Sequence, residues 1–222
     1  MLVREKEMIY YISVNMINNT CDYSLSSLDF SRFLSGKANY GWDLWVRYFL
    51  GFENKHWTHD INVNRHASAS EQFSFVRKRT LFIGLNLVGG KVLNKGDWDL
   101  RIANNLEWTK ELVTRHVPME ASGVIVFGHA KPGLAQQGFL NPLAEFIQLL
   151  DTDIPFLYLH GDGHEWIYTP DFFNVTNYLR IQHRGGTSEP ILRMYADPYG
   201  YPTNVVQAFT FDRRLNNTLS TS

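Results

Sequence analysis

Residues 156–166 read Phe156-Leu157-Tyr158-Leu159-His160-Gly161-Asp162-Gly163-His164-Glu165-Trp166. The run begins with apolar and aromatic residues, which predicts a buried strand, and it passes into a turn that holds an aspartate and a histidine. The glycines on both sides of Asp162 favour a tight turn with positive φ, in which Asp162 and His164 would converge on one point. Carboxylate and imidazole groups together suit zinc, manganese or iron. We therefore expect a divalent metal site at the end of this strand, with His160 behind the ligands rather than among them.

The same construction occurs once more upstream. The β-branched and aromatic run 124–127 stops at Gly128-His129, so a second imidazole follows a second predicted strand. In open α/β sheets ligands collect at the carboxyl ends of strands, and His129 and Asp162 are both placed there. For each histidine the alternative is an ordinary hydrogen-bonded structural residue, and the sequence leaves that alternative open.

Composition limits the class of protein. With 222 residues, 44% of them hydrophobic and 14% aromatic, the chain can bury the core of a single domain spanning 1–222. A net charge of −1 gives no basic field, so nucleic-acid binding is not expected. No apolar run is long enough to span a membrane, and the charged start lacks the apolar core of a signal peptide, which predicts a cytoplasmic protein.

The pattern along the chain predicts an α/β (α+β) fold in which two sheets pack face to face with helices outside. A hairpin is expected over 73–86, and an amphipathic helix over 97–116 with its apolar side at Leu100, Ala103, Leu106 and Val113. A helical aromatic segment is expected around Trp42, Trp45, Phe49 and Phe52. The other expected elements are a helix near 143–150 and strands at 8–14, 124–127, 156–159, 178–183, 191–195 and 208–211.

Several of these segments together resemble the calcineurin-like metallophosphoesterase family, over roughly its C-terminal two-thirds. The segments are 81–86, 124–129, 160–164 and 178–186. The resemblance implies a β-sandwich flanked by helices that hydrolyses phosphate esters, here of a small molecule, with two carboxylate-bridged metal ions. By position, His129 is similar to the histidine that binds the second metal. Gly161-Asp162-Gly163-His164 is similar to the family's terminal Gly-His-x-His, with Asp162 in place of the first histidine.

The upstream motifs of that family are missing. Neither Asp-x-His nor Gly-Asp-x-x-Asp is present, and the third motif would fall on 14–21, where only Asn19 and Cys21 match. Asn15 could still reach a metal through its carbonyl oxygen. Without a bridging carboxylate, one aspartate and two neutral imidazoles neutralise a divalent ion poorly. We therefore expect a single, weakly bound Mn, Fe or Zn ion at His129, Asp162, His164 and Asn15, and impaired hydrolysis.

Two explanations of the missing motifs stay open. The chain is either N-terminally incomplete, so that a missing segment or a partner chain supplies the first strands and ligands, or it is a degenerate pseudoenzyme. A third possibility is unrelated to metal. Six Trp and eleven Tyr could form an aromatic surface that binds a carbohydrate or a peptide.

Overall fold

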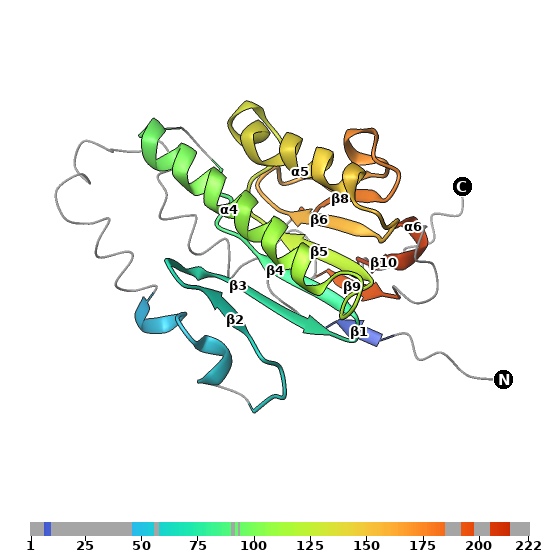
Figure 1. Cartoon of the computed structure of the whole chain (residues 1–222), viewed down its shortest axis with the longest axis horizontal. Helices are drawn as coiled ribbons and strands as arrows, with labels where there is room; N and C mark the ends of the chain where they lie inside the picture. Colours follow the sequence, from blue (N-terminus) through green and yellow to red (C-terminus); the bar gives the residue numbers. More distant parts are fainter. Residues whose placement is uncertain are drawn as a thin grey trace, which may run out of the picture.

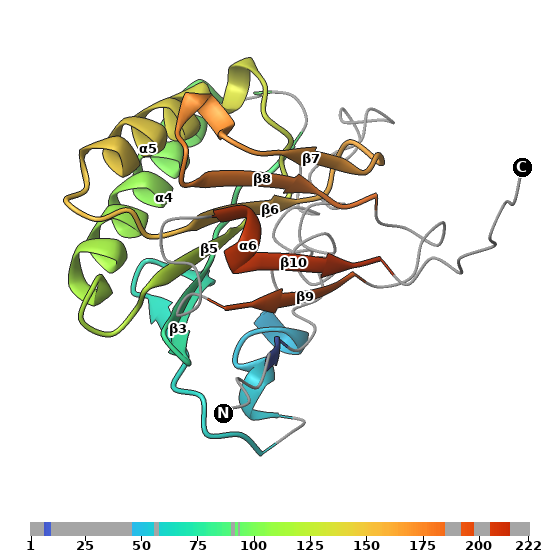
Figure 2. The same cartoon turned by 90° about the vertical axis from the view of Figure 1, so that its right-hand side faces the viewer.

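The computed structural model describes residues 7–9, 46–55, 58–89, 92, 94–184, 192–197 and 205–213. Within these ranges a seven-stranded mixed sheet carries helices on one face (Figure 1) and a three-stranded sheet on the other (Figure 2). The fold is therefore mixed α/β, as the sequence predicts.

The large sheet has the strand order β2-β3-β4-β5-β6-β8-β7. Its inner strands β4, β5, β6 and β8 run parallel, whereas β2 and β3 at one end and β7 at the other are antiparallel to their neighbours. Parallel strands place their carboxyl ends at one edge, where the predicted ligands follow. The strands are β2 (Asn64–His66), β3 (Ala69–Arg77), β4 (Thr80–Gly84), β5 (Gly123–Phe127), β6 (Phe156–His160), β7 (Ile167–Thr169) and β8 (Tyr178–Gln182).

Each residue of β4, β5 and β6 is buried, because both faces of the sheet are covered. In β5, Val124 and Val126 pack into the core beneath the helices, while Ile125 and Phe127 pack into the core beneath the second sheet. This two-sided burial explains why these strands are continuous apolar runs rather than alternating patterns.

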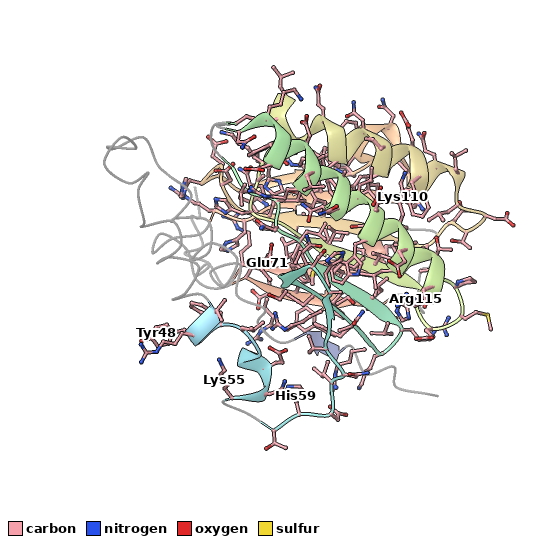
Figure 3. All side chains as sticks on the ribbon, turned by 60° about the vertical axis from the view of Figure 1, so that its left-hand side comes forward. Tyr48, Lys55, His59, Glu71, Lys110 and Arg115 are labelled. Carbon is pink, nitrogen blue, oxygen red and sulfur yellow. The ribbon has the colours of Figure 1, made fainter. Side chains whose placement is uncertain are left out.

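The helical face consists of α4 (Lys95–His116) and α5 (Gln137–Leu149). Asn94 caps α4, since its side-chain oxygen accepts hydrogen bonds from the backbone N–H groups of Gly96 and Asp97. The two helices also meet at their surface, where the Nζ of Lys110 lies 5.5 Å from the ring centroid of Phe146 (Figure 3). Among the helices that the structure describes, none combines the length and the apolar character needed to cross a membrane.

The buried stripe of α4 differs from the expected one. Leu100 is 62% exposed and Ala103 is exposed, so that part of the prediction is wrong. The buried stripe contains two polar residues that donate hydrogen bonds: Asn105 Nδ2 donates to Asn86 O at 3.0 Å, and Thr109 Oγ1 donates to Asn105 O at 2.7 Å. The buried residues are Trp98, Ile102, Asn105, Trp108, Thr109, Leu112 and Val113.

The second sheet has the order β1-β9-β10 and is antiparallel. Its strands are β1 (Glu7–Ile9), β9 (Arg193–Ala196) and β10 (Phe209–Asp212), and the short helix α6 (Val205–Ala208) precedes β10. Met194 and Phe209 share a buried cluster with Leu157 and Ile181 of the large sheet. The expected packing of two sheets, with helices outside one of them, is thus present among the described residues.

Most of the remaining expectations agree with the structure. The hairpin is β3-β4, turning at Lys78 and Arg79, whose φ angles of 46° and 60° are typical of a two-residue hairpin turn. The short edge strands β2 and β7 were not expected, nor were the 3-10 helices at Leu134–Gln136 and Phe172–Asn174. In the segment where an aromatic helix was expected, the structure has a helical turn at 46–48 and a 3-10 helix at Phe52–Asn54. Residues 10–14, Trp42 and Trp45 lie outside the described residues.

Candidate functional site

Three loops meet at the carboxyl edge of the parallel strands. The loop after β4 is bonded to β5 and to the loop after it, because Leu85 N donates to Phe127 O and His129 N donates to Leu87 O, each at 2.9 Å. Farther out, Asn86 Nδ2 donates to Glu71 Oε1 at 2.7 Å, which ties the same loop to β3; Figure 3 labels Glu71. These bonds fix the backbone that carries His129.

His129 and Asp162 are brought together at this edge. The His129 Nε2 lies 3.7 Å from Asp162 Oδ1, and the side chains are 16% and 26% exposed. The backbone N–H of Lys131 donates to the other carboxylate oxygen at 3.2 Å. A separation of 3.7 Å is long for a hydrogen bond. Two tetrahedral ligands of one zinc ion, each about 2.1 Å from it, would have donor atoms about 3.4 Å apart, so this pair has nearly the spacing of two metal ligands.

The turn that presents Asp162 is built differently from the prediction. Positive φ falls on Asp162 (58°) and His164 (53°), not on the two glycines. An aspartate tolerates this conformation better than most residues, and such backbone is common at functional sites. Gly163 matters for packing instead, because a Cβ there would lie 2.3 Å from Gln182 Nε2 and would force that side chain to shift. The expectation of glycines with positive φ is therefore corrected.

A glycine after β4 also belongs to the site. A Cβ on Gly89 would lie 2.8 Å from Asp162 Oδ2, so the loop can approach the carboxylate this closely only without a side chain. Gly89 was not among the predicted site residues. The signal that could have identified it is the Gly89-Gly90 pair shortly after a predicted strand.

His160 is a fully buried neutral base behind the pair. Its Nε2 accepts a hydrogen bond from Arg180 Nε at 2.9 Å, so Nδ1 carries the proton and donates to Gly161 O at 3.1 Å. Burial above all, then the charge of Arg180 and more weakly that of His129, lowers the pKa of His160 to about 3, despite the opposing bond to Gly161. His160 is thus more deeply buried than His129 and Asp162, and its neighbour Arg180 was not among the predicted site residues.

Of the other two predicted ligands, the structure describes only His164, which does not join the pair. His164 is exposed at the turn. Over the part of the chain that the structure describes, no group of three or more His, Cys, Asp and Glu side chains is placed to hold a metal ion. Asn15 lies outside the described residues. Among the described residues, His129 and Asp162 are therefore the two predicted ligands that the structure brings together.

Comparisons with protein-family models, with curated proteins and with solved structures gave no match to this chain.

Proposed function

We propose that the chain is a metallophosphoesterase-like protein that binds one divalent ion (Mn, Fe or Zn) through His129 and Asp162, and a small phosphate ester beside it. The observation that carries the proposal is the 3.7 Å approach of His129 Nε2 to Asp162 Oδ1 at the carboxyl edge of parallel strands. Two sheets packed face to face, with helices outside the larger one, support a metallophosphoesterase-like sandwich.

The chain's own residues would hold and orient such a ligand set. Lys131 N–H fixes one oxygen of Asp162, and the tight turn around Gly163 holds the carboxylate against the loop at Gly89. A bound divalent ion would polarise a phosphoryl oxygen. Binding is expected to be weak, because His129 and Asp162 supply one negative charge between them, and hydrolysis is expected to be slow without a bridging carboxylate.

A non-catalytic binding protein is the second candidate. It is favoured by the absence of a third ligand beside His129 and Asp162 among the described residues. A degenerate site of this kind would keep the ligand-binding edge of the sheet and lose turnover.

Metal titration of the purified chain tests the proposal. Calorimetry with Mn²⁺ and Zn²⁺ should give one ion per chain, and Asp162→Ala or His129→Ala should abolish its binding. The matched control is His116→Ala, because His116 forms the chain's other described histidine–carboxylate pair, with Glu120 at 2.8 Å on the helical side. Equal metal binding in Asp162→Ala and the wild type would refute the proposed ligands. Metal-dependent cleavage of an aryl phosphodiester, lost in Asp162→Ala, would favour the enzyme over the binding protein.

A further inference from the structure

Arg180 is a partly buried cation with polar partners that carry no negative charge. It lies in β8, where its Cα pairs with Tyr158 of β6. Its Nε bonds to His160, two residues farther along β6, so the side chain leans along the strand towards the carboxyl edge. The guanidinium therefore reaches the same edge of the sheet as His129 and Asp162.

The neighbours of the guanidinium are all uncharged. Nε donates to the neutral His160 at 2.9 Å, and Nη2 donates to the amide oxygen of Gln182 at 3.3 Å. The ring of Phe172 lies 5.8 Å from Cζ. Among the described residues, no carboxylate lies within 4.0 Å of the guanidinium. Its charge is thus only partly solvated by protein dipoles and an aromatic face.

The partners of Arg180 are themselves held in place. Gln182 is 1% exposed, and while its oxygen accepts from Arg180, its Nε2 donates to Glu165 O at 3.1 Å. His160 is fully buried, with both ring nitrogens bonded. The direction of the guanidinium is therefore set before any ligand arrives, which lowers the entropy lost on binding.

The position contrasts with the paired arginines of this chain. Arg65 bonds both oxygens of Glu53, and Arg77 bonds Asp60 at 2.8 Å. Burial lowers the pKa of Arg180, and the electrostatic effect of Tyr158 offsets this only in part. A buried charge of this kind is stabilised by an oxyanion that offers two acceptor oxygens to the N–H groups left over.

We propose that Arg180, held by His160 and Gln182, binds an oxyanion of the phosphate or carboxylate type at the carboxyl edge of the sheet. The subsite does not rest on the metal proposed above, because none of its contacts involves His129 or Asp162. It adds a point of attachment for the charged group of a ligand.

The test is calorimetric titration of the full chain with inorganic phosphate, and separately with acetate, in EDTA and at constant ionic strength set with chloride. At least one of the two anions should bind the wild type. Arg180→Gln should weaken that binding about tenfold or more, the loss expected for charge-assisted hydrogen bonds. The anion affinity of Arg180→Lys should lie between those of the wild type and Arg180→Gln, since lysine keeps the charge without the planar guanidinium.

Arg101→Gln is the matched control. Arg101 is also partly buried and lies 5.8 Å over an aromatic ring, that of Trp98, but it is on α4 and is not hydrogen-bonded to His160. Its replacement should leave anion affinity unchanged. Binding of phosphate identifies a phosphate-type subsite, and binding of acetate alone identifies a carboxylate subsite. The proposal is overturned if neither anion binds the wild type, or if Arg180→Gln, folded by circular dichroism, binds as tightly as the wild type.

Discussion

Acid should destabilise this protein through His160 in particular. The imidazole is fully buried and its pKa is lowered from 6.5 to about 3, mainly by burial and then by the charge of Arg180. In the folded state it stays neutral, because the site offers a hydrogen-bond donor to Nε2 and no anion to an imidazolium. In the unfolded chain the same residue is an ordinary histidine that accepts a proton as the pH falls below 6.5.

The sign and size of the effect follow from this difference. Between pH 6.5 and about 3 the unfolded state binds one proton more than the folded state, so stability falls as the pH falls. Each pH unit in that window costs about 1.4 kcal/mol, and lowering the pH from 6.5 to about 5 therefore costs about 2 kcal/mol. From about one pH unit above 6.5 this contribution is constant.

Urea unfolding at a series of pH values, in EDTA, measures the slope. His160→Gln keeps an acceptor for Arg180 and removes the titrating group, so its free energy of unfolding should fall less steeply by about 1.4 kcal/mol per pH unit. His116→Gln, at the exposed pair with Glu120, should not flatten the slope by that amount. Ring signals of His160 in NMR spectra should stay constant to about pH 4. The reasoning would be refuted if the free energy of unfolding changed equally with pH in His160→Gln and the wild type. A titration midpoint of the His160 ring signals near 6.5 would refute it as well.

Two further expectations concern matched pairs of substitutions. Tyr158 and Tyr178 are both fully buried, but the Tyr158 hydroxyl donates to a backbone carbonyl at 2.6 Å while that of Tyr178 has no hydrogen-bond partner in the described structure. Tyr158→Phe should therefore cost about 1 kcal/mol or more in chemical denaturation, whereas Tyr178→Phe should be neutral or stabilising; the reverse order would contradict the assigned bonds. Gly163→Ala should lower stability by about 1–3 kcal/mol, since its Cβ would lie 2.3 Å from the fixed side chain of Gln182. The control in calorimetry is Gly133→Ala, because a Cβ there meets nothing within 4 Å. If Gly163→Ala and Gly133→Ala had the same melting temperature, the side chain of Gln182 would move aside without cost.

Local pattern determined much of the fold. Runs such as 124–127 and 156–159 are apolar throughout because both of their faces are buried, and that property is visible in the sequence. The rule that carboxyl ends of parallel strands share an edge was enough to place His129 and Asp162 at one edge of the sheet. Their role as metal ligands and the family resemblance stay predictions.

Tertiary structure alone decided the features that depend on distant partners. The buried stripe of α4 includes Asn105, because a carbonyl from the loop after β4 accepts its amide hydrogen bond, and periodicity cannot reveal such a partner. Gly163 reads as a flexible turn residue, yet it is fixed by the side chain of Gln182 from another strand. In the sequence Arg180 is an ordinary arginine of a predicted strand, and only the fold places it beside His160, Gln182 and Phe172. In each case the deciding energy is a contact or a desolvation between segments far apart in the chain, which sequence spacing does not encode.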